Sequence, residues 1–175
     1  MKANGHTPQP LEDKIQRVPV DELFLDAKNP RLQGMDERTD QKTLLKQLWT
    51  EYSLDGLMLS ITKNGYFPEE PLFVVKEEGK YIVIEGNRRL AAVKILRDAK
   101  LQQELRATDL PSLSAEIRKQ TNSLPVSVYP DRKSLWPYLG FRHVNGPLTW
   151  ESWSKAQYIA QVHNTTGISL DEIAD

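Results

Sequence analysis

The chain has 175 residues, enough for one ordinary domain with a hydrophobic core and a short appendage. Its 23 basic and 24 acidic side chains nearly cancel, so the total charge demands neither a nucleic acid nor an anionic membrane as partner. The absence of cysteine excludes disulfide scaffolds, cysteine-ligated metals and thiol nucleophiles, and only three scattered histidines are present. No apolar run reaches the roughly 18 residues of a membrane span, and the amino terminus lacks a signal-peptide core. We therefore expect a soluble cytoplasmic protein with no membrane partner.

The first part of the chain predicts a polar lead-in, a strand and two helices. Residues 1–16 are polar and contain proline, and we expect them to be disordered. Val18 to Leu25 is typical of a short strand and turn. Residues 36–52 carry leucines at helical spacing. A second helix is predicted to have Ser53 as its N-cap and to stop at Asn64-Gly65.

The middle of the chain predicts a hairpin that leads directly into a helix. Pro71 to Lys76 favours a strand, the following four residues favour a turn, and Tyr81 to Ile84 favours the returning strand. A helix is predicted from Arg88. Residues 98–123 have a helical pattern that is interrupted at Pro111.

Leu124 to Tyr129 predicts a last strand. The expected fold class is therefore α+β, a small mixed β-sheet with flanking helices followed by a C-terminal helical segment, because the elements do not repeat as βαβ units.

The carboxyl-terminal segment, residues 133–175, has a helical character of its own. It holds Trp136, Trp150 and Trp153, which we expect to pack between helices, with stacking on nucleic-acid bases as the alternative. Its last residues include Ser169 and Glu172 at the spacing of a capping box. Because a helix so well capped would end after one turn, we expect the natural chain to continue beyond this sequence into a helix-turn-helix.

The most informative pattern lies where the hairpin meets the following helix, in Glu85-Gly86-Asn87-Arg88-Arg89. A strand, a glycine turn and a helix start present backbone N–H groups to an anion. Two arginines at the positive end of a helix dipole are unfavourable by about 1 kcal/mol or less each, unless an anion binds there. The pattern therefore predicts a ligand that carries phosphate.

These segments together resemble the N-terminal domain of ParB-type proteins, within the ParB/sulfiredoxin superfamily. The resemblance covers roughly residues 17–175 and places the nucleotide-binding domain at 17–132. It rests on Asn29-Pro30-Arg31, a helix ending at Gly65, Glu70-Pro71 before a strand, the block Gly86 to Ala92, and the strand Leu124 to Val128. The sulfiredoxin branch requires a catalytic cysteine and is excluded.

The resemblance implies that Gly86, Arg88 and Arg89 hold the phosphates of a nucleoside triphosphate, CTP or ATP, together with Mg²⁺. Asn87 stands where the family usually has glutamate. The loop from Gly65 to Pro71 would line the same pocket.

In that loop, Glu70 stands where many members of the family have glutamine. The resemblance also implies that the full-length protein associates with DNA, and that the domain forms a homodimer in the manner of its relatives.

A third family motif, Glu-Asn-x-x-Arg, has no match in this sequence. Its nearest counterpart is Phe141 to Gly146, which lacks the glutamate, and Arg142 and His143 of this segment are expected to join the pocket. His143 either adds charge or moves protons there, or is a packed and hydrogen-bonded residue.

Glu85 has two interpretations as well, a catalytic base or magnesium ligand close to the phosphates, and a structural partner of an arginine. The main functional hypothesis is a nucleotide-dependent switch in a DNA-associated protein. The alternatives are a CTPase, ATPase or small-molecule kinase of the same fold, a nuclease, and a DNA-binding module without nucleotide.

Overall fold

The computed structural model describes residues 15–32, 36, 38–107, 110–145 and 150–168. Its strands are β1 (Gln16–Pro19), β2 (Leu23–Leu25), β3 (Leu72–Glu77), β4 (Lys80–Glu85) and β5 (Ser123–Tyr129). They form one five-stranded sheet in the order β1-β5-β3-β4-β2. The pairs β1/β5 and β3/β4 are antiparallel, whereas β5/β3 and β4/β2 are parallel. The sheet is therefore mixed, and the predicted fold class is confirmed.

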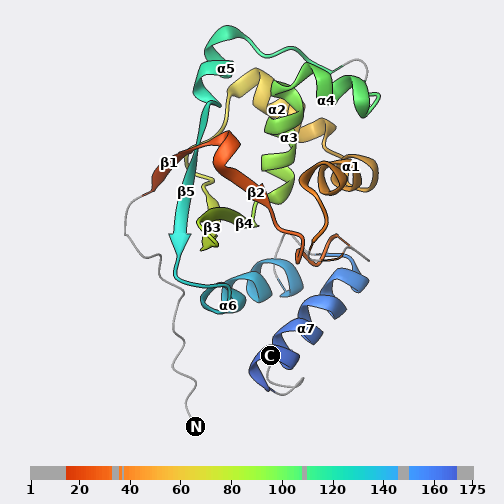
Figure 1. The fold of residues 1–175 in the computed structure, drawn as a ribbon, viewed down its shortest axis with the longest axis vertical. Coiled ribbons are helices and arrows are strands. Elements are labelled where there is room, and N and C mark those ends of the chain that lie inside the picture. The colour runs from red at the N-terminus through yellow and green to blue at the C-terminus, as the bar shows by residue number, and fades with distance from the viewer. Residues whose placement is uncertain (1–14, 33–35, 37, 108–109, 146–149, 169–175) are drawn as a thin grey trace.

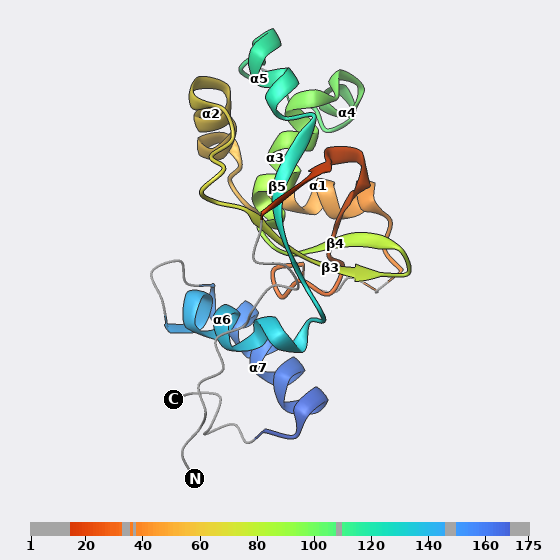
Figure 2. The same cartoon turned by 90° about the vertical axis from the view of Figure 1, so that its left-hand side faces the viewer.

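Helices cover both faces of this sheet (Figure 1). On one side lie α1 (Gln41–Glu51), α2 (Asp55–Asn64), α3 (Asn87–Arg97), α4 (Ala99–Glu104) and α5 (Ala115–Gln120). On the other side lie α6 (Trp136–Gly140) and α7 (Ser152–Thr166), as the side view shows clearly (Figure 2). Short connecting turns are η1 (Val20–Glu22), η2 (Lys133–Leu135) and η3 (Phe141–Asn145), the last of which is π-helical.

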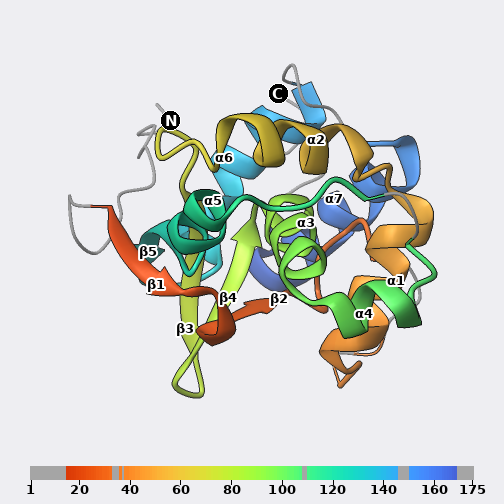
Figure 3. The same ribbon diagram turned by 90° about the horizontal axis from the view of Figure 1, so that it is seen from above.

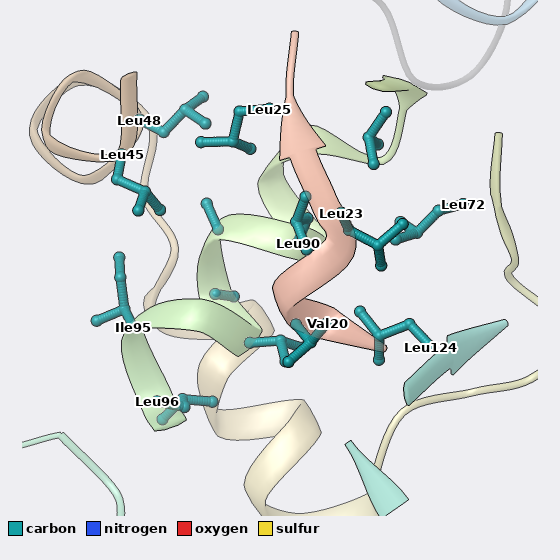
Figure 4. Close-up of a cluster of buried hydrophobic side chains, with 14 of the residues drawn as sticks. Val20, Leu23, Leu25, Leu45, Leu48, Leu72, Leu90, Ile95, Leu96 and Leu124 are labelled. Carbon is teal, nitrogen blue, oxygen red and sulfur yellow. The ribbon is translucent and has the colours of Figure 1, made fainter. Parts of the chain in front are cut away.

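Alternating side chains of the central strands supply two separate cores. Leu72 and Val74 of β3 point into the larger core, together with Val83 of β4, whereas Val75 of β3 and Ile84 of β4 belong to the smaller one. This alternation follows from the two-residue period of a strand. Figure 4 shows part of the larger core, in which Leu90 of α3 and side chains of β2 and α1 come together.

The position of α3 fixes the site described below. It lies between α1 and α2 when the molecule is seen from above (Figure 3). Seven of its eleven residues are buried, so the helix is held firmly against the sheet. Its amino end follows β4 directly, through the single residue Gly86.

Two predicted helix starts are wrong. The first helix begins at Gln41 and not at residue 36, because the carboxylate of Asp40 accepts the N–H groups of Lys42 and Thr43, each at 3.0 Å. The second begins at Asp55, and the residue before it, Leu54, makes no side-chain cap. Ser53 is therefore not the N-cap.

Other boundaries also differ from the predictions. Gln16, placed in the lead-in, already pairs with Val126 in β1. The predicted strand and turn of residues 18–25 are two strands, β1 and β2, separated by η1, and they occupy opposite edges of the sheet. The interruption at Pro111 is wider than predicted, because α4 ends at Glu104 and α5 starts only after its cap, Ser114.

The carboxyl-terminal segment packs on the second face of the sheet. Trp136 and Trp150 are buried in the smaller core, as expected, but Trp153 is 56% exposed, so its predicted packing role is wrong. The capping box at Ser169 and Glu172 lies outside the described residues, so the helix-turn-helix stays a prediction. None of the helices in the described ranges has the length and apolar character that crossing a bilayer requires.

Candidate functional site

A cavity of about 300 Å³ opens beside the amino end of α3. It is bounded by α2, the loop between α2 and β3, the start of α3 and η3. Eight of the nine predicted site residues line it: Glu70, Glu85, Gly86, Asn87, Arg88, Arg89, Arg142 and His143. Pro71, the ninth, does not line the cavity but precedes β3. The structure thus brings together predicted residues that are up to 73 positions apart in the chain, from Glu70 to His143.

Gly86 is required at the turn between β4 and α3. Its φ of +99° lies in the left-handed region, which side chains with a Cβ rarely adopt. A Cβ here would lie 2.4 Å from Leu72 Cδ2 and 3.0 Å from Arg89 Nη2. No side chain caps the helix that starts here, so its first N–H groups have no side-chain acceptor, and its first residues line the cavity.

The two arginines of the motif are held differently. Arg88 donates from Nη2 to the carbonyl oxygen of Ser53 at 2.6 Å, and its Nε is buried with no hydrogen-bond partner among the described residues. Arg89 lies between two carboxylates, with Nη1 3.3 Å from Glu70 Oε2 and Nη2 3.8 Å from Glu85 Oε1. It also donates to the carbonyl oxygen of Glu70.

Arg142 reaches the same two carboxylates from η3. Its Nη2 is 3.4 Å from Glu70 Oε2 and its Nε is 3.6 Å from Glu85 Oε1. Its Nη1 donates to the hydroxyl of Tyr138 at 2.5 Å. Glu70 and Glu85 therefore connect the start of α3 to η3, and any ligand that attracts Arg89 and Arg142 competes with these ion pairs.

Glu85 and His143 form a buried pair at the base of the cavity. His143 Nε2 is 2.7 Å from Glu85 Oε2, and the imidazole stacks on the Trp150 indole with ring centres 4.4 Å apart. Burial, the largest single effect, raises the pKa of Glu85, but His143, Arg89 and Arg142 together outweigh it and the pKa is lowered from its usual value. Glu85 is thus a stabilised carboxylate.

That state bears on the two interpretations of Glu85. A general base works best when its pKa is near the working pH, and a carboxylate with a lowered pKa accepts a proton poorly. The contacts of Glu85 with Arg89, Arg142 and His143 favour the structural interpretation. They equally favour the packed, hydrogen-bonded interpretation of His143, which is only 2% exposed.

The amide of Asn87 is occupied by the fold. Its Oδ1 accepts the N–H of Asp26 at 3.0 Å, and its Nδ2 donates to the carbonyl oxygens of Val83 at 2.7 Å and Ile84 at 3.4 Å. These bonds join the start of α3 to the ends of β2 and β4. Asn87 could therefore contact a ligand through its backbone N–H, with its side chain committed elsewhere.

Several lining residues were not named individually from the sequence, although Tyr66 and Phe67 belong to the loop from Gly65 to Pro71 that was expected to line the pocket. Tyr66 donates its hydroxyl to the carbonyl oxygen of Glu70 at 3.0 Å and accepts from Arg89 Nη1 at 3.4 Å, and burial raises its pKa to about 12. Leu57, Ile61 and Phe67 give the cavity an apolar side. Asn29 and Arg31, from the segment Asn29-Pro30-Arg31, also line it.

The charge of the cavity is strongly unbalanced. Four arginines line it, at positions 31, 88, 89 and 142, against the two carboxylates of Glu70 and Glu85. With His143 counted as neutral, the surplus is two positive charges. Such a cavity suits an anion with several acceptor oxygens, because guanidinium groups pair with phosphate and carboxylate oxygens at fixed geometry.

Comparison with models of known protein families supports the family resemblance inferred from the sequence. The sequence model described as "ParB N-terminal domain" matches residues 7–123, well over half of the chain. No curated protein matches significantly. The crystal structure of sulfiredoxin from Arabidopsis thaliana aligns with 71% of this chain and 94% of its own, at 18% identity and a TM-score of 0.33, and a likeness of this size supports no conclusion.

Proposed function

The chain belongs to the ParB N-terminal domain family, and we propose that its cavity binds the phosphates of a nucleoside triphosphate, CTP or ATP. The observation that carries the proposal is the surplus of arginines at the uncapped amino end of α3. Anions bind readily at helix amino ends, where N–H groups and the helix dipole act together. Here Arg88, Arg89 and Arg142 would add charge-assisted hydrogen bonds to the same phosphates.

The volume and the lining residues of the cavity support a nucleotide as ligand rather than inorganic phosphate alone. A volume of about 300 Å³ is at the lower end of the range for small-molecule sites. The apolar side chains of Leu57, Ile61 and Phe67 could cover the face of a base, and the half-exposed Phe67 ring could stack on it. We expect the phosphates near α3 and the base near α2.

Magnesium would be held mainly by the ligand. Among the residues that the structure describes, no group of three or more histidine, aspartate and glutamate side chains is placed to hold a metal ion. Mg²⁺ commonly binds through substrate phosphates with only one or two carboxylates, and Glu70 and Glu85 are the carboxylates that line this cavity. When bound, the ion would neutralise part of the charge on the phosphates.

A switch would work through the ion pairs that cross the cavity. Phosphates that pair with Arg89 and Arg142 would replace Glu70 and Glu85 as their acceptors. Because Arg142 lies in η3, directly after α6, this exchange could move the carboxyl-terminal helices. Ligand binding shifts such an equilibrium only by its difference in affinity for the two arrangements. In the full-length protein, we propose that the shift changes its association with DNA.

Calorimetric titration tests the binding proposal. The protein is titrated with CTP, ATP, GTP and UTP in the presence of Mg²⁺, alongside Arg88→Ala. We expect saturable binding of at least one nucleotide, about 10- to 100-fold weaker in the variant, since a hydrogen bond to a charged group is worth about 1.5–3 kcal/mol. Lys100→Ala removes an exposed cation outside the cavity and should change nothing. Absence of binding at millimolar nucleotide would refute the proposal.

A further inference from the structure

A second, more open cavity of about 610 Å³ lies near the carboxyl end of α3. It is bounded by η1, α1, the last turn of α3 and the start of α4. Within the described ranges, its lining has no residue in common with that of the first cavity. Its charged lining residues are Asp21, Lys94, Arg97, Asp98 and Lys100. The first cavity and its ligand therefore leave this group of charges unexplained.

The amine of Lys94 is held at this cavity by a neutral acceptor. Its Nζ donates to the carbonyl oxygen of Val20 at 3.0 Å, and the side chain is half-buried. The position of that carbonyl is fixed, because the N–H of Val20 donates to the carbonyl oxygen of Asn122 at 3.0 Å. Lys94 forms no ion pair with any residue that the structure describes. By contrast, Lys42 of α1 pairs with Glu104 at 2.6 Å.

This environment favours the uncharged form of the amine. Burial lowers the pKa of Lys94, and the attraction of Asp21 for the ammonium does not reverse the shift. Only the free amine is a nucleophile, and a lysine in a desolvated site is activated for this reason. Each unit by which the pKa falls gives about 10-fold more free amine at neutral pH. Lys94 thus combines a fixed position beside an open cavity with an enhanced population of the reactive form.

The other charges of the cavity suit a small anionic reagent. Three cations line it against two carboxylates, a surplus of one positive charge. The Asp98 carboxylate is engaged by the backbone N–H groups of Lys100 and Leu101, at 2.9 and 3.0 Å. The side chain of Lys100 is exposed. A cleft with an excess of one sign of charge raises the local concentration of reagents of the opposite sign.

We propose that Lys94 is a nucleophilic lysine of this second cavity and is acylated by small acyl phosphates. The free Nζ attacks the acyl carbon, the bond between that carbon and the phosphate oxygen breaks, and phosphate leaves with the electron pair. The proton lost by the amine passes to phosphate or water. The product is a neutral amide near the carboxyl end of α3. This inference does not depend on the proposed function.

Peptide mapping by mass spectrometry, after incubation with acetyl phosphate at pH 7, measures the initial rate of acetylation at each lysine. Lys63 is the reference, because it is exposed and lies outside both cavities. In the folded protein we expect Lys94 to react about 3-fold faster than Lys63, or more. In guanidinium chloride, where burial is lost, the two rates should be equal. A folded-state rate at Lys94 no greater than that at Lys63 overturns the inference, as does the same preference in the unfolded chain.

The pH dependence and one carboxylate variant test the cause of the reactivity. The preference for Lys94 should shrink as the pH rises from 7 to 10, because Lys63 then loses its proton as well. Asp21→Asn should speed the reaction at Lys94, since it removes an attraction for the ammonium. Glu22→Gln, at an exposed position outside the cavity, is the matched control and should change nothing. A preference that is constant with pH overturns the inference.

A comparison of two acetyl donors tests the class of reagent. Lys100→Gln should slow acetylation of Lys94 by acetyl phosphate more than by the uncharged acetyl ester of N-hydroxysuccinimide, because only the phosphate is attracted by the lost cation. Equal effects on the two reagents overturn the assignment of an acyl phosphate.

Discussion

The side-chain amide of Gln120 forms hydrogen bonds with both the N–H and the carbonyl oxygen of Tyr66. Its Oε1 accepts the Tyr66 N–H at 3.0 Å, and its Nε2 donates to the Tyr66 carbonyl oxygen at 3.3 Å. The contact is possible because the preceding residue is Gly65, where a Cβ would lie 2.3 Å from Gln120 Oε1. Since Tyr66 contacts Arg89, the end of α5 supports, from outside the cavity, the wall that carries Arg89.

Replacing Gln120 by alanine should weaken both the fold and the site. Two backbone hydrogen bonds are lost, at about 1 kcal/mol each, and the loop that carries Tyr66 and Glu70 becomes looser. We expect a loss of about 2 kcal/mol in the free energy of unfolding by urea, and weaker nucleotide binding. Gln103→Ala, at an exposed position on α4, is the control and should leave both unchanged. Binding that survives Gln120→Ala would show that the loop does not depend on this support.

Gly86→Ala and Gly56→Ala should change stability in opposite directions. At Gly86 the new methyl meets Leu72 and Arg89 and the φ is +99°, so we expect a loss of about 2 kcal/mol or more together with loss of binding. At Gly56, inside α2, nothing lies within 4 Å of the added Cβ, and alanine should stabilise by about 0.5–1 kcal/mol. Thermal or urea unfolding of both variants measures the contrast; similar effects would contradict the geometry of the β4–α3 turn.

Acid should destabilise the protein through Glu85. Its pKa is lowered in the folded state from an ordinary value of 4.5, so the folded state binds the proton less well than the unfolded chain. The stabilisation is therefore fully present above about pH 5 and is lost as the pH falls through the lowered folded pKa. Unfolding free energy measured from pH 7 to pH 3 should fall in the acid range.

Glu85→Gln should reduce the loss of stability in acid. Part of that loss should remain, because the hydrogen bond with Arg132 also lowers the pKa of Glu77. At pH 7 the variant should be less stable by about 3 kcal/mol, because it leaves Arg89, Arg142 and His143 without a buried carboxylate. An acid dependence identical to that of the parent would exclude Glu85 as its source.

The motif at the amino end of α3 could be recognised from the sequence because the residues that form it are consecutive. A strand, a glycine that must take a left-handed φ, and arginines at a helix start lie within five consecutive residues, Glu85 to Arg89. The cap of α1 was equally local, at Asp40, but the leucines at helical spacing begin only at Leu44 and do not mark the residue where the helix starts. Ser53 failed as a cap although serine suits that position, since the helix begins two residues later, after Leu54.

The rest of the site depends on contacts between distant parts of the chain. Gln120 and Tyr66 are 54 residues apart, and nothing near either residue indicates that they meet. Arg31 follows Asn29-Pro30, which is also an ordinary turn sequence, so only the fold shows that its side chain faces Arg88 and Glu85. The family resemblance predicted residues of the pocket, and the family itself is confirmed. The partners that hold these residues in place could be identified only from the three-dimensional structure.

The central claim, that the cavity binds a ligand by its phosphates, is tested most directly by shortening the phosphate chain. The nucleotide that binds best is compared by calorimetry with its diphosphate, its monophosphate and the free nucleoside, at fixed Mg²⁺ and ionic strength. If the arginines at the start of α3 hold the phosphates, affinity should fall with each phosphate removed and should vanish for the nucleoside. A nucleoside that binds as tightly as the triphosphate would contradict the account.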